Sequence, residues 1–237
     1  MRIAGLQKLT LLDFPGRLSA TIFTSGCDLR CPFCHNASLV NDAENSDFSA
    51  EEILDFLKER KGRLTGLAIT GGEPLLQADI TEFIKQVKEI GYAVKLDTNG
   101  TYPEKLKVIL REGLVDYVAM DIKNCFDSYP KTIGLENADK ICGPLIDNVK
   151  ESIELLKSSG IPFEFRTTIV KELHSKEEIE KMAKEIGAVD KYFIQSYVDS
   201  GDILNDFGFS AYSKNELLEI LDLVKKYIPN AQLRGVD

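Results

Sequence analysis

The sequence predicts an α/β fold in which helices cover a parallel β-sheet. Apolar, strand-like runs alternate with amphipathic helical stretches about six times along the 237 residues. Polar motifs directly follow several of these runs, at the positions where α/β proteins bind ligands. Because parallel crossover connections are right-handed, the sheet either opens as a doubly wound layer or curls towards a barrel.

The first half of the chain contains three predicted strand–helix units. Residues 19–24 form the first strand, because they are rich in apolar and β-branched side chains. Ser49 and Glu52 make a capping-box pattern that begins the first helix. The elements that follow are a strand at 66–70, a helix beginning near Asp79, a strand at 92–97 and a helix after Pro103.

The second half continues the alternation. A strand at 115–120 is followed by an irregular stretch from Lys123 to about Pro144, and then by a helix around Val149 and Ile153. The remaining elements are a strand at 163–170, a helix capped by Ser175 and Glu178, a strand at 191–196, and a helix from the Ser213–Glu216 capping box to about Tyr227.

Composition and charge exclude several classes of function. The chain has 43% hydrophobic and 28% charged residues, and we expect residues 1–237 to form one domain. A net charge of −9 repels phosphate backbones, so nucleic acid is not an expected partner. The sequence contains no run of about 18 apolar residues, so no membrane span is expected. Lys8 interrupts the N-terminal stretch where a signal peptide would need apolar residues, so we expect a cytoplasmic monomer.

Three of the five cysteines crowd into residues 24–36 with the spacing Cys27-x3-Cys31-x2-Cys34. In a reducing compartment this pattern favours metal or redox chemistry over disulfides. A structural zinc site needs four ligands, and His35 directly adjoins Cys34, where reaching the same ion is awkward. Covalent haem and a thioredoxin-like dithiol both leave Cys27 without a role. The remaining interpretation is three thiols that bind no metal or cofactor.

A [4Fe–4S] cluster held by three thiolates accounts for all three cysteines. Clusters that only transfer electrons usually have four cysteine ligands. With three ligands, one iron keeps an open position for a substrate or cofactor, as catalytic zinc sites do. The absence of a fourth cysteine nearby therefore indicates a catalytic cluster.

These motifs resemble those of the radical S-adenosylmethionine enzymes. The resemblance rests on the cysteine spacing, on the aromatic Phe33, and on the Gly-Gly-Glu-Pro sequence at 71–74. Within that family the chain is similar to the small activating enzymes of glycyl-radical proteins. Segments 11–16 and 26–36 resemble anaerobic ribonucleoside-triphosphate reductase activating proteins, and segments 97–100 and 120–123 resemble pyruvate formate-lyase activating enzyme. The resemblance implies a partial (βα)6 TIM-like barrel with parallel strands.

The resemblance also implies a role for each matched residue. Cys27, Cys31 and Cys34 would ligate the cluster, whose open iron would chelate S-adenosylmethionine. The implied cofactor-binding residues are Phe33, Gly71, Gly72, Glu73, Pro74, Asp97, Asn99, Asp121, Lys123, Arg166 and His174. The implied ligands of a monovalent cation, Na⁺ or K⁺, are Asp97, Thr98, Met120 and Asp121. Such a cation would compensate the charge of the carboxylates beside the cofactor.

The activity implied is that of an oxidoreductase. It would cleave S-adenosylmethionine reductively and generate a glycyl radical on a partner enzyme of the anaerobic ribonucleotide reductase or pyruvate formate-lyase type. Flavodoxin or ferredoxin would donate the electron, and no catalytic residue beyond the cluster and cofactor is expected. One alternative is a radical S-adenosylmethionine enzyme that acts on a small molecule, of the 7-carboxy-7-deazaguanine synthase kind. The other is a non-catalytic metal-binding or electron-transfer module. Cys125 and Cys142 match no motif and are expected to be ordinary thiols.

Overall fold

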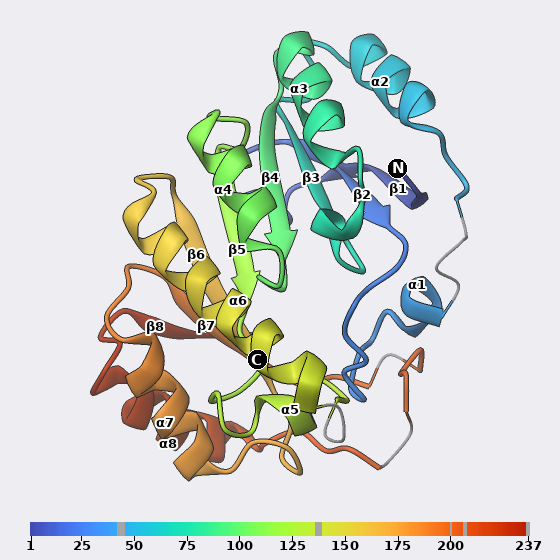
Figure 1. The fold of residues 1–237 in the computed structure, drawn as a ribbon. Coiled ribbons are helices and arrows are strands. Elements are labelled where there is room, and N and C mark those ends of the chain that lie inside the picture. The colour runs from blue at the N-terminus through green and yellow to red at the C-terminus, as the bar shows by residue number, and fades with distance from the viewer. Residues whose placement is uncertain (42–45, 136–138, 200, 206–207, 236–237) are drawn as a thin grey trace.

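The computed structural model describes residues 1–41, 46–135, 139–199, 201–205 and 208–235. They build one eight-stranded sheet whose strands lie in chain order (Figure 1). Strand β1 pairs with β2 antiparallel, and β2 to β8 run parallel. The strands are β1 (Ile3–Thr10), β2 (Ser19–Thr24), β3 (Gly66–Gly71), β4 (Ala93–Thr98), β5 (Tyr117–Asp121), β6 (Phe163–Ile169), β7 (Tyr192–Ser196) and β8 (Ala231–Arg234).

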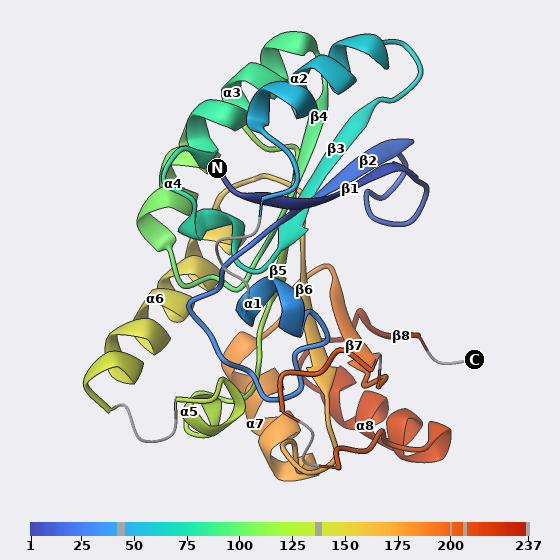
Figure 2. The same cartoon turned by 90° about the vertical axis from the view of Figure 1, so that its right-hand side faces the viewer.

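The longer helices lie on the outer side of the curved sheet (Figures 1 and 2). They are α2 (Ala50–Glu59), α3 (Ile80–Ile90), α4 (Pro103–Arg111), α6 (Asp139–Ser158), α7 (Lys176–Ile186) and α8 (Lys214–Lys225). Short elements interrupt the connections that leave the carboxyl ends of β2, β3 and β5. These are α1 (Ala37–Asn41), the 3-10 turn η1 (Pro74–Leu76) and α5 (Tyr129–Thr132).

The predicted fold class is confirmed. The six predicted strands are β2 to β7, and the sheet curls like a barrel that stays open between β1 and β8 (Figure 2). The three predicted capping boxes are present at the starts of α2, α7 and α8. In α2 the apolar stripe of Ile53, Leu54 and Leu57 is buried, so helical spacing identified the face that packs on the sheet.

Two strands and part of a helix differ from the prediction. Strands β1 and β8 were not predicted, because β1 contains only two buried residues, at its two ends, and β8 has only four residues. The stretch expected to be irregular as far as Pro144 contains α5, and α6 already begins at Asp139. Pro144 lies inside α6, where Cys142, Leu145 and Val149 are buried. Their burial offsets the backbone hydrogen bond that proline cannot make.

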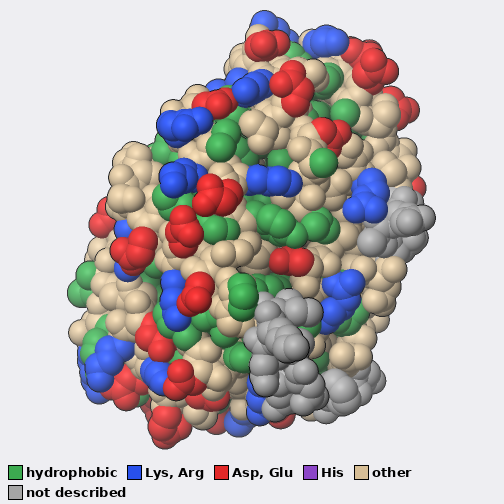
Figure 3. Space-filling model, viewed as in Figure 1, with side chains coloured by type: hydrophobic (Ala, Val, Ile, Leu, Met, Phe, Trp, Pro, Cys, Tyr) green, Lys and Arg blue, Asp and Glu red, His purple; other side chains and the backbone are tan. Residues whose placement is uncertain are grey.

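The charge of the chain is dispersed on the face drawn in Figure 3, where Lys and Arg alternate with Asp and Glu. None of the helices that the structure describes has the length and apolar character needed to span a bilayer.

Candidate functional site

A cavity of about 230 Å³ lies at the carboxyl ends of the parallel strands. Its walls come from the cysteine loop (residues 24–36), from the ends of β3, β4 and β5, and from β6 and β7. The predicted residues that line it are Cys27, Cys31, Phe33, Cys34, Gly71, Gly72, Pro74, Asp97, Thr98, Asn99, Asp121, Lys123 and Arg166. Because the carboxyl ends of parallel strands share one edge of a sheet, motifs distant in sequence meet there.

The three thiols of the cysteine loop face this cavity. Cys31 is buried, and Cys27 and Cys34 are half-buried. Burial raises the pKa of the Cys31 thiol to about 12 and also raises the pKa of Cys27, so both keep their protons until a metal displaces them. Among the described residues, no three His, Cys, Asp or Glu side chains converge on one metal ion. A cluster suits three separate thiols, because each thiolate binds a different iron.

Two segments distant in sequence hold the cysteine loop in place. The amide of Arg30 donates to the carbonyl of Ile133 at 3.0 Å, directly after α5. The amide of Leu204 donates to the carbonyl of Cys34 at 3.1 Å, in the connection between β7 and α8. The loop is thus fixed by the tertiary structure, as a site that accepts a preformed cluster requires.

Gly71 and Gly72 meet the start of the cysteine loop without room for side chains. The amide of Gly72 donates to the carbonyl of Thr24 at 2.8 Å. A Cβ atom on Gly72 would lie 2.0 Å from the carbonyl oxygen of Gly26, and one on Gly71 would lie 2.3 Å from that of Thr24. Both glycines are therefore required for the backbone of β3 to approach the loop.

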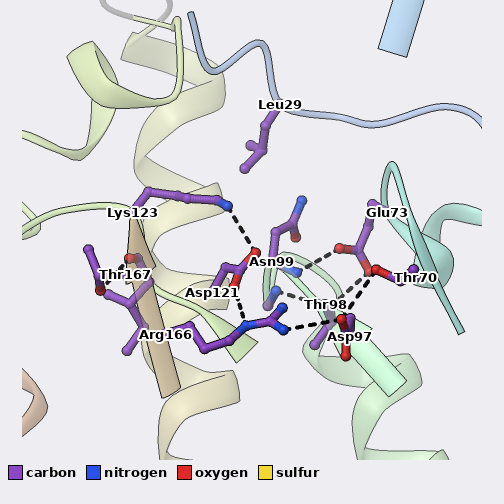
Figure 4. A network of polar contacts seen from close by, with 12 residues as sticks. Leu29, Thr70, Glu73, Asp97, Thr98, Asn99, Asp121, Lys123, Arg166 and Thr167 are labelled. Carbon is purple, nitrogen blue, oxygen red and sulfur yellow. Dashed lines mark hydrogen bonds and ion pairs between the residues drawn. The ribbon is translucent and has the colours of Figure 1, made fainter. Parts of the chain in front are cut away.

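The Glu73 side chain is fully buried, and its carboxylate points towards Thr98 and Asn99 (Figure 4). It accepts hydrogen bonds from the hydroxyl of Thr98 at 2.8 Å and from the amides of Leu75 at 2.9 Å and Asn99 at 2.7 Å. Its burial raises the pKa of Glu73 to about 8 against the effect of these donors. The structure thus places Glu73 as a link between η1 and the end of β4, not as a group facing a ligand.

Arg166 connects two carboxylates on the cavity floor (Figure 4). Its Nε lies 2.8 Å from Asp121 and its Nη1 lies 3.2 Å from Asp97. Lys95 also pairs with Asp97, and Lys123 lies 3.1 Å from Asp121. Burial alone would raise the pKa of Asp121, but Arg166 and Lys123 hold that pKa well below its usual range. The floor therefore has three cations and two carboxylates, and each carboxylate pairs with Arg166 and with one lysine.

The four predicted ligands of a monovalent cation do not converge. Arg166 occupies the space between Asp97 and Asp121, and the Thr98 hydroxyl is directed to Glu73. Met120 is buried, and its Cε would contact a Cβ placed on Gly100 at 2.1 Å. The structure gives no support to Na⁺ or K⁺ at this position, because a guanidinium already supplies the positive charge.

Asn99 joins the end of β4 to the cysteine loop. Its side-chain amide donates to Asp28 at 2.9 Å and approaches the Cys27 sulfur at 3.9 Å. Its side-chain oxygen accepts from the hydroxyl of Thr101 at 2.7 Å. The Asn99 side chain is thus oriented by its own loop and borders the thiol wall.

His174 lies outside the cavity. Its ring is fully buried, with Nε2 at 2.7 Å from the carbonyl of Lys123 and Nδ1 at 3.0 Å from the amide of Val170. The Phe33 ring meets it edge-on, with ring centroids 6.1 Å apart. Burial lowers the pKa of His174, so the ring is neutral in the fold. Cys125 and Cys142 are also buried, form no disulfide and lie away from this cavity.

Seven lining residues were not among the predicted site residues: Leu29, His35, Asn36, Val40, Thr70, Thr168 and Gln195. Leu29 and Val40 contribute apolar surface, and Thr168 and Gln195 lie opposite each other on β6 and β7. Gln195 lies near the end of the predicted strand at 191–196, and that strand-end position is the signal that points to it. Nothing in the spacing of Leu29 or Val40 separates them from ordinary core positions.

Comparison with known proteins agrees with this site. The Radical SAM superfamily pattern matches residues 21–186. A Methanocaldococcus jannaschii protein named as a glycyl-radical enzyme activating enzyme is 34% identical over 241 residues, covering 99% of this chain and 96% of its own. Pyruvate formate-lyase-activating enzyme of Clostridium pasteurianum is 30% identical over 225 residues, covering 91% of this chain and 87% of its own.

Solved structures share the fold at low identity. Streptococcus suis SuiB bound to precursor peptide SuiA aligns with a TM-score of 0.64 at 17% identity over 91% of this chain. The chain spans 48% of the length of SuiB. Archaeal TYW1 aligns with a TM-score of 0.55 at 15% identity over 89% of this chain and 72% of its own. By the match over residues 21–186 and by its full-length relatives, the chain belongs to the radical SAM superfamily, in the family of glycyl-radical enzyme activating enzymes, and it is an oxidoreductase whose family uses a [4Fe–4S] cluster and S-adenosylmethionine.

Proposed function

We propose that this protein generates a glycyl radical on a partner enzyme. The observation that carries the proposal is one cavity in which three thiols stand together with Gly71, Gly72 and the Arg166 charge network. The names of both full-length relatives support the class of partner. We further propose that residues 1–237 act as a single domain and as a cytoplasmic monomer, with flavodoxin or ferredoxin as electron donor.

The residues of the cavity fit the cofactors of the family. Cys27, Cys31 and Cys34 would hold the [4Fe–4S] cluster, since they line one wall and no fourth thiol lines the cavity. The bound cluster and S-adenosylmethionine supply one-electron cleavage of a sulfonium bond and removal of a hydrogen atom from a glycine α-carbon. The chain itself supplies position, charge and exclusion of water.

The charged floor would orient the zwitterionic end of the cofactor. Lys123 and Arg166 offer cations to its carboxylate, while Asp97 and Asp121 keep both cations in place. The backbone of Gly71 and Gly72 borders the cavity and is our candidate for the amino group of the cofactor.

Two apolar residues and two buried polar residues also contribute to the proposed cofactor site. Phe33 and Pro74 supply apolar surface next to the cluster wall. Glu73 and His174 act by positioning, since Glu73 holds the amide of Asn99 and His174 holds the carbonyl of Lys123. A Na⁺ or K⁺ ion would bind between Asp97 and Asp121 only when the cofactor draws Arg166 away, so we assign charge compensation to Arg166.

The proposal is tested with anaerobically reconstituted enzyme. We expect iron and sulfide, a reduced-cluster EPR signal that changes when S-adenosylmethionine is added, and 5′-deoxyadenosine as product. Incubation with candidate glycyl-radical enzymes should give the doublet EPR signal of a glycyl radical. Cys31→Ala should abolish both signals, whereas Cys125→Ala, at a buried thiol away from the cavity, should retain them.

Two results would contradict the proposal. An EPR signal unaffected by S-adenosylmethionine argues for a non-catalytic cluster. Formation of 5′-deoxyadenosine without a glycyl radical on any candidate partner argues for a small-molecule substrate.

A further inference from the structure

The edge of the open barrel displays a cluster of apolar side chains. Leu11 is 74% exposed and Leu12 is 89% exposed in the connection between β1 and β2, and Leu9, near the end of β1, is 56% exposed. These three residues, which we call the leucine patch, are three of the five large apolar residues most exposed in the described chain. Exposed apolar side chains that gather in one place mark sites of protein interaction, whereas single ones do not.

The leucine patch is displayed by a folded connection. Phe14 is buried against Ala93 and Tyr117, the first residues of β4 and β5. The Thr10 hydroxyl accepts a hydrogen bond from the amide of Leu12 at 3.2 Å. Because the backbone is already fixed, a partner would bind these leucines without the cost of ordering a loop.

The leucine patch lies beside one edge of the open sheet. Strands β1 and β8 are the two edges of the sheet, and Figure 2 shows the β1–β2 connection and β8 on the same side of the molecule. Apart from the bridge between Ile3 and Phe48, the described residues place no second strand beside β1. The cysteine loop stands at the carboxyl ends of the strands, and the sheet stays open between its edge strands β1 and β8, a gap that we call the side opening.

The leucine patch is too far from the cavity to serve a small substrate. Strand β2 has six residues and separates the β1–β2 connection from the cysteine loop. At about 3.3 Å per residue this is a separation of about 17 Å. A molecule held in the cavity cannot reach the leucines unless it is itself a protein.

The charge around the leucine patch is complementary to an acidic partner surface. Lys8 and Arg17 are exposed on either side of it, and the Arg17 guanidinium lies 5.4 Å from the centre of the Phe14 ring. The nearby Asp13 carboxylate is turned inward, where it accepts a hydrogen bond from the Thr21 hydroxyl at 2.6 Å. In a chain of net charge −9 this edge therefore combines apolar surface with outward-facing cations.

We propose that the leucine patch is the docking surface for the protein substrate. The occupant is an apolar segment, flanked by carboxylates, of the partner whose glycine receives the radical. The inference rests on the proposed function and adds where the partner binds. The body of the partner would rest on the leucine patch while its glycine-bearing segment passes through the side opening to the cavity.

The test uses cluster-loaded enzyme and a candidate glycyl-radical enzyme that the wild type activates. The double variant Leu11→Ser/Leu12→Ser should raise KM for the partner by about tenfold or more, since each leucine loses its buried contact. Its kcat at saturating partner should be retained. Partner-independent cleavage of S-adenosylmethionine, measured in parallel, reports whether the cofactor site is intact.

The matched control is Leu218→Ser on α8, where Leu218 is 46% exposed outside the leucine patch. It should leave KM for the partner at the wild-type value. A double variant with wild-type KM, or a control that raises KM equally, overturns the docking inference while the proposed function stands. A wild-type enzyme that cleaves S-adenosylmethionine but activates no candidate partner overturns the proposed function, and the docking inference with it.

Discussion

At the scale of single residues, Arg166 determines the charge balance of the cavity. It contacts Asp97 and Asp121 at once, which a point charge such as lysine cannot do with the same geometry. Its side chain is 14% exposed, so water screens these pairs only weakly. Without Arg166, each carboxylate would keep only a lysine partner, Lys95 for Asp97 and Lys123 for Asp121.

Arg166→Met should therefore destabilise the fold by about 3 kcal/mol, the typical result of removing one partner of a buried ion pair. Arg166→Lys should recover part of this loss, because the charge remains but one contact is missing. Adding Asp121→Asn to Arg166→Met should also recover part of it, since the buried carboxylate that lost its guanidinium partner is removed. Denaturant unfolding of the three variants measures these differences. Equal stabilities of Arg166→Met and wild type would contradict the charge-balance role.

His174 should make the protein sensitive to acid. Burial lowers the pKa of this ring below its usual 6.5, so below pH 6.5 the unfolded chain binds a proton that the native state does not. The stabilisation is complete above pH 6.5 and is lost as the pH falls towards the native pKa. His174→Gln should be less stable than wild type at pH 7.5 but should show a flatter decline to pH 5. Urea unfolding at several pH values checks this, and parallel declines in both proteins would contradict it.

The sequence indicates which residues meet at the strand ends, but it does not indicate the direction of particular side chains. Cysteine spacing and strand-end position can be read from the sequence, and both fix where the backbone carries a residue. Thirteen of the predicted positions line one cavity for this reason. Glu73 and His174 were expected to face a ligand, yet their polar atoms are bound by the protein. The sequence does not show which donors a buried group will find, because those donors come from other elements.

At the scale of elements, the contact between β3 and the cysteine loop decides whether the site can form. Gly72 lies where the two backbones touch, and its amide donates to Thr24 at 2.8 Å. Elsewhere in the site, side chains lie between the backbones of neighbouring motifs and can change conformation. At Gly72 the two backbones are in direct contact, so an added side chain would have to displace the loop that carries the thiols.

Gly72→Ala should reduce iron binding strongly, because its Cβ would lie 2.0 Å from the Gly26 oxygen. Gly113→Ala is the matched control. Gly113 has a φ of +64° and no atom within 4 Å of an added Cβ, so strain of about 1 kcal/mol is expected without loss of iron. Iron content after reconstitution and thermal unfolding distinguish the two. Full iron content in Gly72→Ala would show that the cysteine loop can shift to accommodate the added Cβ atom.

Elements with strong periodicity were predictable and those that depend on neighbours were not. The helices α2, α7 and α8 have capping boxes and buried stripes that are local properties of the sequence. Strand β8 has four residues and exists because β7 offers a free edge, and α5 has four residues held between β5 and the cysteine loop. Tertiary context outweighs propensity in segments this short.

At the scale of the whole molecule, the cysteine loop is held by two connections from the second half of the chain. The connection between β5 and α6 contacts it through Ile133, and the connection between β7 and α8 contacts it through Leu204 and Asn205. Neither connection carries a thiol of the cluster site. Because they bind the loop through backbone hydrogen bonds, order in the loop and order in these connections are energetically linked.

Loading the cluster should therefore slow amide hydrogen exchange in three separate segments together: 27–34, 128–134 and 201–205. Cluster binding fixes the three thiols, and the amides of Leu204 and Asn205 donate to carbonyls of the fixed loop at 3.1 Å. Helix α3, on the outer face, should show no change. Cys31→Ala treated in the same way is the control, since it lacks one ligand. Protection confined to 27–34 would show that the connections are independent of the loop, and that the site is assembled locally rather than by the whole fold.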